Sequence, residues 1–309
     1  MKIEENTPLA KFTNYKIGGP AKYFLRARNK KEIKEGIKWA ESKKLKVFIL
    51  GGGTNLLISD RGFNGLVLKV DIKNLNANGL RVRSGAGVEI KKLINFAIKN
   101  RLSGLEWAGG LPGTLGGAIR GNAGAFRGEI KDNIESVRSF NVKTLKARIC
   151  LGRHCDFSYR NSFFKKHDNE EIILNAVLKL KKGDPKMIRA TTQDKINFRK
   201  NRHPLEYPNS GSVFKNVDIK RVPKKTLEKF NHLIKTDPFP VLPTAVLISE
   251  AGLKGKRSGG AMISTKHPNF IVNVNNAKAK DILALIKLAK ATIKRKFGVI
   301  IEEEVQIIR

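Results

Sequence analysis

Cysteine, acidic residues, aromatic residues and long apolar runs are all scarce in this sequence. The 309-residue chain has two cysteines, Cys150 and Cys155, with His154 beside them. They form no Cys-x-x-Cys pair, and two thiols with one imidazole lack the spacing and the fourth ligand of a zinc site, so we expect ordinary thiols and no metal. No apolar run approaches the roughly 20 residues that span a bilayer. The N-terminal stretch MKIEENTPLAKF lacks the apolar core of a secretory signal, so we expect a cytoplasmic protein without membrane insertion.

The scarcity of acidic residues leaves a large positive charge. The chain has 61 Lys and Arg against 27 Asp and Glu, a formal net charge of +34. Such a charge makes nucleic acid a candidate partner. However, the basic residues are spread along the whole chain, and the aromatic residues, only 7%, do not interleave with a basic stripe as single-strand binding requires. We therefore favour a Lys-rich surface over a dedicated nucleic-acid site, with anionic small molecules as natural ligands and a monomer as the expected state.

Helix-type and strand-type patterns are mixed along the chain. Ile33, Ile37 and Ala40 recur at helical spacing, whereas KVFIL at 46–50 is typical of a buried strand. The elements do not alternate strictly, so the pattern predicts an α+β fold with a boundary near residue 200. Helices are expected over 31–44, 90–100, 185–204, 224–235, 244–255 and 279–298, and strands over 46–50, 65–70, 80–87, 134–142, 170–182, 269–274 and 299–308.

Glycine is concentrated in two places. Eight of the twenty residues from Gly109 to Gly128 are glycine, out of 28 in the chain, and a triple glycine follows the strand in VFILGGGTNLLI. Glycine permits positive φ, and successive N–H groups form anion-binding nests. Neither the dinucleotide fingerprint nor a Walker loop is present, and the triple glycine alone fits a tight turn equally well. Together the segments suggest a dinucleotide held by main chain, with Thr114 and Asn122 as side-chain donors.

A series of longer motifs points to a family. TNYKIGGPAKYF, LGGGTNLLI, GLPGTLGGAIRGNAGAF, FSYRNSFFK, NSGSVFKN, EAGLKGKRSGGAMIS, TKHPNFIVN and IEEEVQII follow one another along the chain. In kind and order they resemble the UDP-N-acetylenolpyruvoylglucosamine reductase (UDP-N-acetylmuramate dehydrogenase) family over nearly the whole length. The interval from Arg160 to Ser212, 212 − 160 = 52 residues, resembles the branch that lacks an extra substrate-covering loop.

The resemblance implies both an architecture and a reaction. The architecture is an FAD-binding domain of the p-cresol methylhydroxylase type, in two α+β subdomains (1–66 and 67–200), an α+β substrate-binding domain (201–298) and a C-terminal catalytic strand (299–309). The reaction is NADPH-dependent reduction of UDP-N-acetylglucosamine enolpyruvate to UDP-N-acetylmuramate through FAD. It belongs to peptidoglycan precursor synthesis, and so to cell-wall formation, cell shape and cell division. Another flavin oxidoreductase of the same fold, acting on a different substrate, is the alternative enzyme.

Individual residues take their expected roles from the same resemblance. Arg160 and Glu304 match the groups that stabilise the enol, and Ser212 matches the proton donor. The positions matched to substrate binding are Tyr159, Arg202, Lys215, Asn216 and His267, of which His267 fits a surface histidine equally well. The positions matched to cofactor binding are Gly51, Gly52, Gly53, Thr54, Asn55, Pro112, Gly113, Thr114, Gly117, Asn122, Gly124 and Arg199.

The C-terminal glutamates and four departures from the family pattern complete the expectations. Period-two alternation over 299–308 puts Ile301, Glu303, Val305 and Ile307 on one face, so Glu302 and Glu304 point together and only the resemblance selects Glu304. The departures are Val241 in place of a common lysine, Gln306 in place of a frequent arginine, Asp218 in place of a common proline, and Arg120 where an apolar or aromatic residue is frequent.

Overall fold

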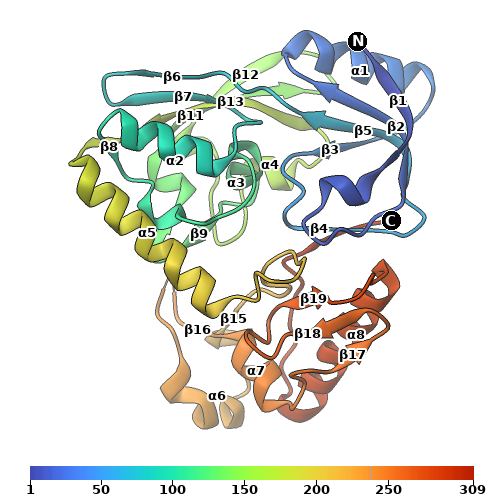
Figure 1. Ribbon diagram of the computed structural model, residues 1–309, viewed down its shortest axis with the longest axis vertical. Helices are drawn as coiled ribbons and strands as arrows, with labels where there is room; N and C mark the ends of the chain where they lie inside the picture. The colour runs from blue at the N-terminus through green and yellow to red at the C-terminus, as the bar shows by residue number, and fades with distance from the viewer. Residues whose placement is uncertain (238) are drawn as a thin grey trace. The chain divides into compact units, whose positions relative to one another are not determined.

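The computed structural model describes residues 1–237 and 239–309 and divides into two units (Figure 1). Unit 1 comprises Met1–Thr7, Ala21–Gly52 and Asn64–Arg199. Unit 2 comprises Pro8–Pro20, Gly53–Phe63 and Lys200–Arg309. The boundary expected near residue 200 coincides with a division between units, but both units also draw on N-terminal segments. The assignment of the ranges 1–66, 67–200, 201–298 and 299–309 to FAD and substrate binding stays a prediction.

A four-stranded sheet forms the first layer of unit 1. Its order is β1 (Ile3–Pro8), β2 (Pro20–Ala27), β5 (Phe63–Val70) and β3 (Lys46–Leu50), with β3 parallel to β5. Helix α1 (Lys30–Ser42) begins where the Asn29 side chain accepts the Glu32 N–H at 2.9 Å. The helix buries Ile33, Ile37 and Ala40, as the helical spacing predicted.

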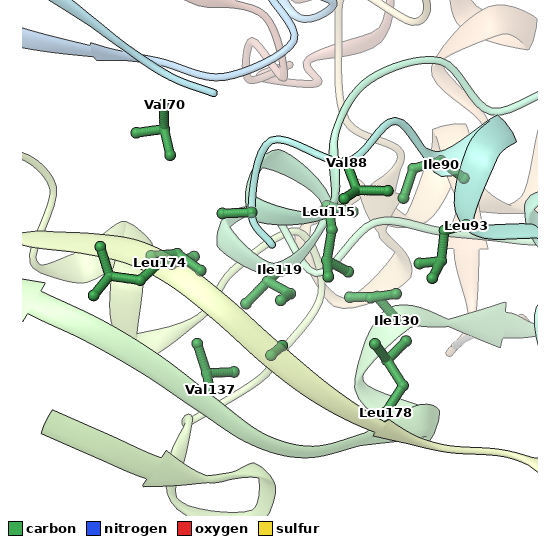
Figure 2. Packing of buried hydrophobic residues seen from close by; sticks show 14 of the residues in the cluster. Val70, Val88, Ile90, Leu93, Leu115, Ile119, Ile130, Val137, Leu174 and Leu178 are labelled. Carbon is green, nitrogen blue, oxygen red and sulfur yellow. The ribbon is translucent and has the colours of Figure 1, made fainter. Parts of the chain in front are cut away.

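A five-stranded antiparallel sheet forms the second layer of unit 1. Its order is β12 (Ala147–Leu151), β11 (Ile134–Asn141), β13 (Glu171–Lys179), β7 (Arg81–Gly85) and β6 (Leu75–Asn78). Apolar side chains of α2 (Ile90–Lys99) and α3 (Leu115–Arg120) join those of β11 and β13 in one core (Figure 2). Burying each large aliphatic side chain stabilises the fold by about 1.5–3 kcal/mol, so this core fixes the loops that leave it. The remaining elements of unit 1 are β8 (Leu102–Ser103), β9 (Gly124–Ala125), β10 (Gly128–Glu129), α4 (Phe163–Lys166), β14 (Lys181–Lys182) and α5 (Pro185–Arg202), whose last three residues belong to unit 2.

Unit 2 has a separate core built on its longest helix. Helix α8 (Ala279–Phe297) buries Ile282, Leu285, Ile286 and Ile293. It ends at Gly298, the last residue of the predicted range 279–298, whose φ of +68° is the left-handed conformation that glycine adopts readily after a helix. The strands pair as β17 (Arg257–Ser258), β18 (Ala261–Ile263) and β19 (Ile271–Asn273), as β15 (Val217–Asp218) with β16 (Val241–Leu242), and as β4 (Leu56–Ile58) parallel to β20 (Gln306–Ile308). The other helices are α6 (Lys224–Phe230) and α7 (Thr244–Glu250), and 3-10 turns lie in the two units at Leu9–Phe12, Glu106–Ala108, Ile130–Asn133, Gly152–His154, Ile219–Arg221 and Asn231–Leu233.

The structure confirms the α+β class and corrects three predicted elements. The helix expected over 244–255 ends at Glu250. The helix expected over 224–235 ends at Phe230 and continues only as a 3-10 turn. The strand expected over 299–308 is regular only at Gln306–Ile308. Before that point the chain makes an isolated bridge between Phe214 and Glu303, and the N–H groups of Glu304 and Val305 both donate to the Val213 carbonyl. Two residues opposite one form a bulge, which breaks the alternation: Ile308 is buried and Ile307 only half-buried.

Candidate functional site

The two glycine segments meet in unit 1. A Cβ added to Gly52 would lie 2.8 Å from the Gly113 Cα, and one added to Gly51 would lie 3.2 Å from the Thr114 Oγ1. Thr114 Oγ1 is buried and has no hydrogen-bond partner among the residues that the structure describes. We call Gly51, Gly52, Gly113, Thr114 and Gly117 the glycine cradle. It combines closely packed main chain with a buried hydroxyl that is ready to bond a ligand.

Other glycines of the 109–128 segment have a packing reason instead. A Cβ at Gly116 would lie 2.9 Å from the Ala86 Cβ, one at Gly124 would lie 2.7 Å from the Glu129 Cγ, and one at Gly128 would collide with the Trp107 ring. The density of glycine is therefore explained partly by close packing and not by ligand contact alone. For Gly124, packing is sufficient, and its cofactor role stays a prediction. Pro112 lies exposed just before the cradle.

The Asn122 amide has partners within the protein, and its expected role as a ligand donor stays a prediction. Asn122 is fully buried, its Nδ2 donates to the Ser158 carbonyl at 3.0 Å, and its Oδ1 accepts the Lys131 N–H at 3.4 Å. The side chain ties together two loops of unit 1. A polar residue in a glycine-rich loop cannot be assigned to ligand or scaffold from sequence, because both uses favour the same amide.

A lysine that the sequence reasoning missed supports the cradle. Lys69, in strand β5, donates from Nζ to the Gly51 carbonyl at 2.9 Å. Burial lowers the pKa of this ammonium, which the nearby Asp71 partly offsets. The available signal was a lysine inside the otherwise apolar stretch GLVLKV, where a charge needs a partner.

Arg199 supplies a second unsatisfied group in unit 1. Its Nε donates to the Gly109 carbonyl at 2.9 Å, and its guanidinium lies 5.2 Å from the centre of the Phe126 ring. Its Nη2 is buried without a hydrogen-bond partner in the described chain, and burial lowers the pKa of the guanidinium. A buried guanidinium with an unsatisfied N–H donor favours an anionic ligand.

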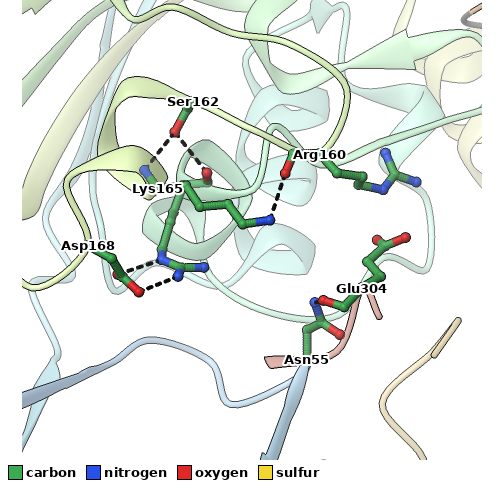
Figure 3. A network of polar contacts seen from close by, with 7 residues as sticks. Asn55, Arg160, Ser162, Lys165, Asp168 and Glu304 are labelled. Carbon is green, nitrogen blue, oxygen red and sulfur yellow. Dashed lines mark hydrogen bonds and ion pairs between the residues drawn. The ribbon is translucent and has the colours of Figure 1, made fainter. Parts of the chain in front are cut away.

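Arg160 is held on a strained turn of the same unit. Its φ of +54° is left-handed, its Nη2 donates to the Gly124 carbonyl at 3.1 Å, and its own carbonyl accepts the Lys165 Nζ at 2.8 Å (Figure 3). The guanidinium lies 5.0 Å from the ring of Tyr159. Left-handed backbone at a residue other than glycine is uncommon and often accompanies function, because the surrounding fold must enforce it.

A network of hydrogen bonds among Ser162, Arg120 and Asp168 adjoins this turn. Ser162 caps α4 and donates from Oγ to the Arg120 carbonyl at 2.8 Å, while the Arg120 side chain forms a two-bond ion pair with Asp168 at 2.6 and 3.0 Å (Figure 3). Arg120, which stands where the family frequently has an apolar or aromatic residue, is therefore paired with Asp168. Its partner explains how an arginine is accommodated there.

In unit 2 the segments that carry Ser212 and Glu304 lie side by side. The Glu304 N–H donates to the Val213 carbonyl at 2.7 Å, and the Lys215 N–H donates to the Glu302 carbonyl at 2.9 Å. Asn269 fixes the same segment, because its side chain both accepts the Phe214 N–H and donates to the Phe214 carbonyl. Main-chain hydrogen bonds thus join two predicted catalytic segments that are far apart in the sequence.

The three glutamates have different surroundings. Glu302 pairs with Arg221 at 2.7 Å and Lys215 at 3.2 Å, which together lower the pKa of its carboxyl, and Glu303 pairs with Lys290 at 2.8 Å. The Glu304 carbonyl accepts the Asn55 Nδ2 at 2.9 Å (Figure 3). The environment therefore separates Glu302 from Glu304, which alternation alone did not.

Several predicted ligand groups have structural partners. Asn55 positions Glu304, and Asn216 accepts the Thr244 N–H at 3.3 Å where α7 begins. Gly53 has a φ of +67°, and a side chain there would collide with the Phe12 carbonyl. Thr54 is half-buried beside it. These contacts give the residues a role in the fold, and binding by them stays a prediction.

His267 is not a freely exposed surface histidine. Its ring lies 4.8 Å from Phe270 and 5.5 Å from His203, and its Nδ1 is buried with no partner in the described part of the chain. Burial lowers the pKa of the imidazole. Arg202, in contrast, is exposed at the last residue of α5.

Three departures from the family pattern have clear places in unit 2. Val241 is 1% exposed in β16, and its main chain exchanges two hydrogen bonds with Lys235. Gln306 begins β20, and its N–H donates to the Asn55 carbonyl at 3.0 Å. Asp218 accepts the Lys220 N–H at 2.9 Å and so begins a 3-10 turn.

Neither a metal-binding cluster nor a membrane-spanning helix is found in residues 1–237 and 239–309. They hold no group of three His, Cys, Asp or Glu side chains arranged for a metal ion. None of their helices is long and apolar enough to cross a membrane.

Comparisons with known proteins cover the whole chain. Residues 203–308 match the family described as UDP-N-acetylenolpyruvoylglucosamine reductase, C-terminal domain, and residues 21–143 match the FAD binding domain family. The reductase of that name from Clostridium novyi (strain NT) is 36% identical, with 99% of this chain and 92% of that protein covered. The one from Solibacter usitatus is 34% identical, over 100% and 97%. The crystal structure of the Thermus caldophilus reductase is similar with a TM-score of 0.79 at 28% identity, over 100% of both chains.

Two polar groups of unit 1 suit the chemistry of FAD. The glycine cradle lies within residues 21–143, which match the FAD binding domain family, and Arg199 belongs to the same unit outside that range. They present a buried hydroxyl and a buried guanidinium nitrogen that the described residues leave without a hydrogen-bond partner. A flavin dinucleotide carries two phosphates and many hydrogen-bonding groups that suit both donors.

Proposed function

This chain is an FAD-dependent oxidoreductase of the UDP-N-acetylenolpyruvoylglucosamine reductase family, and we propose that it reduces UDP-N-acetylglucosamine enolpyruvate to UDP-N-acetylmuramate with NADPH. The proposal places this step of peptidoglycan precursor synthesis in the cytoplasm. The observation that carries it is the pairing of the Ser212 and Glu304 segments, with the Glu304 N–H 2.7 Å from the Val213 carbonyl.

The glycine cradle and Arg199 would hold the cofactor. Close main-chain packing leaves no room for a side chain at Gly52, and Gly113 has a φ of +108°, which side chains disfavour. The unsatisfied Thr114 Oγ1 and Arg199 Nη2 are the donors that would meet polar groups and phosphate. The chemistry supplied by bound FAD is hydride transfer, from NADPH to the methylene carbon of the enolpyruvyl double bond.

Three residues of this chain would stabilise the negative charge of the substrate and supply the proton that completes the reduction. Arg160 would grip the substrate carboxylate through parallel N–H groups, because a guanidinium is planar and fixed. Glu304 can stabilise developing enol charge only as a neutral acid that donates its O–H. Ser212 would give its hydroxyl proton to the carbon next to the carboxylate, which completes the saturated lactyl ether.

The basic groups around the Ser212 segment suit a nucleotide substrate. Lys215 and Arg221 are both anchored on Glu302, so two cations are presented on one carboxylate and the group carries a net positive charge. Such a cluster would favour a ligand with two phosphates, and the net charge of +34 would increase its rate of encounter.

The test is an anaerobic titration of the purified protein followed by its visible spectrum. The flavin band should bleach with NADPH and return only when the enolpyruvyl UDP-sugar is added. The variant Ser212→Ala should bleach normally but recover roughly 10²–10⁴-fold more slowly, the usual loss for a general acid. Ser42→Ala, at the exposed end of α1, is the matched control and should behave as the unmodified protein.

The alternative outcomes separate the parts of the proposal. A band that bleaches but returns only with oxygen would keep the flavin and assign the enzyme to another substrate. An unchanged rate for Ser212→Ala would overturn the proton-donor assignment alone. A colourless protein that no added FAD converts would overturn the function.

A further inference from the structure

The two cysteines form a close pair that the proposed reaction does not use. Cys150 lies near the end of the edge strand β12, and Cys155 follows the 3-10 turn Gly152–His154. The Cys155 thiol donates to the Cys150 sulfur with the two Sγ atoms 3.2 Å apart, and both cysteines are free thiols. A disulfide needs the sulfurs at about 2.05 Å, so they have only about 1.2 Å to close.

The two thiols differ in access. Cys155 is fully buried in the core of unit 1, whereas Cys150 is partly exposed. Burial and the neighbouring Cys150 sulfur raise the pKa of the Cys155 thiol, with Arg148 acting in the opposite direction. Because the thiolate is the attacking form, a reagent in solution should react first at Cys150.

We propose that Cys150 and Cys155 are a redox modification site, in which a low-molecular-weight disulfide converts the two thiols to an intramolecular disulfide. The Cys150 thiolate attacks the reagent, forms a mixed disulfide and releases one small thiol. Cys155 then loses its proton and attacks the Cys150 sulfur, which expels the second small thiol. Two protein S–H bonds and one reagent S–S bond are replaced by one protein S–S bond and two small-molecule S–H bonds.

A disulfide between Cys150 and Cys155 would constrain the loop that contains Tyr159 and Arg160. The Cys155 carbonyl accepts the Phe163 N–H at 2.8 Å, and the Ser158 and Asn161 main chains exchange two hydrogen bonds. Cys155 and Phe163 therefore close the base of the loop that contains Tyr159 and Arg160. A disulfide would tie this base to the sheet edge by a covalent bond, and reduction would release it.

The experiment is exposure of the whole purified protein to oxidised glutathione, followed by intact-mass and free-thiol measurement. The expected product has lost two hydrogens, has no free thiol, yields a 150–155 cross-linked peptide without reduction and reverts with dithiothreitol. Cys155→Ala should retain one glutathione on Cys150, because the resolving thiol is absent. Cys150→Ala should gain glutathione at least tenfold more slowly, because only the buried thiol remains.

The contrary results are equally distinct. A protein that accumulates two glutathione adducts, or dimers linked between chains, with no 150–155 peptide would overturn the proposal. Equal reaction rates of Cys150→Ala and Cys155→Ala would overturn the assigned order. If a variant does not fold, the cross-linked peptide of the unmodified protein decides alone.

Discussion

The glycine cradle of unit 1 and a ladder of hydrogen-bonded segments in unit 2 are built in opposite ways. The cradle works by the absence of side chains: a single Cβ at Gly52 would lie 2.8 Å from the Gly113 Cα. The ladder, which we define as Val213–Lys215 with Glu302–Val305, works by side chains and main-chain bonds that hold charged groups in place. In the ladder, the Glu302 and Glu303 carboxylates form ion pairs with Arg221 and Lys290. The cradle, as defined above, contains no charged side chain.

The difference determines which substitutions should matter. Crowding acts through steep repulsion, so adding one carbon to the cradle should have a large effect. A ladder of many hydrogen bonds and half-exposed ion pairs distributes its stabilisation, so removing one member should have a smaller effect. The predictions below examine this contrast in order of decreasing expected size.

Substituting Gly52→Ala should weaken FAD binding most. The added Cβ would lie 2.8 and 3.1 Å from the Gly113 Cα and the Thr114 N, and the two segments must move apart to relieve an overpacking cost of about 1–3 kcal/mol. Because this displacement would distort the surface that meets FAD, the Kd should rise by up to roughly 150-fold. The measurement is flavin fluorescence quenching on titration of the apoprotein. Gly121→Ala is the matched control, because its Cβ would have no neighbour closer than 3.6 Å. Equal Kd values for the two variants would mean that the cradle does not contact the flavin.

Asn55→Ala should impair the ladder without removing the flavin. It deletes the bond from Nδ2 to the Glu304 carbonyl, which costs about 1 kcal/mol of stability. A less constrained Glu304 should slow recovery of the flavin band by the enolpyruvyl UDP-sugar on the order of tenfold, with bleaching by NADPH unchanged. Stopped-flow absorbance separates these half-reactions, and Asn76→Ala, exposed in β6, is the control. Slower bleaching with normal recovery would place Asn55 on the cofactor side instead.

Sequence patterns correctly predicted the elements whose ends and buried faces are determined by residues close in the sequence. The spacing of Ile33 and Ile37 predicted α1, and Gly298 predicted the end of α8, because both signals act within a few residues. The strand expected over 299–308 was wrong for its first seven residues. There the register depends on Val213, whose carbonyl accepts two N–H groups from the bulge.

Tertiary partners explain the site features that the sequence did not predict. Lys69 and Arg221 were missed, because their partners, the Gly51 carbonyl and the Glu302 carboxylate, lie 18 and 81 residues away along the chain. The bond from Asn122 to the Ser158 carbonyl, 36 residues away, was also not predicted. Residue type indicates that a polar group needs a partner, and only the fold determines which partner it finds.

The substitution His267→Gln should make folding stability decrease less as the pH becomes acidic. Burial lowers the pKa of His267, so below the ordinary histidine pKa of about 6.5 the unfolded chain takes up a proton that the folded chain does not. Folding stability should therefore fall as the pH decreases from about 6.5 through the lower folded-state pKa. Urea unfolding at a series of pH values should show a shallower decline for the variant. His232→Gln, exposed in unit 2, is the control, and identical slopes for His267→Gln and the unmodified protein would contradict the assignment.

Glu302→Gln should have the smallest effect, below about 1 kcal/mol, although it breaks two ion pairs. The carboxyl is 44% exposed, and water and salt screen its pairs with Arg221 and Lys215. Those cations lower its pKa, so their contribution is present above the unfolded value of about 4.3 and is lost as the pH falls through the lower folded value. Urea unfolding at low and high salt should show the deficit only at low salt, with Glu303→Gln, which breaks the less exposed pair with Lys290, as the comparison. A salt-independent loss above about 2 kcal/mol would mean that the ladder acts as a buried charge cluster, as sensitive to a single change as the cradle.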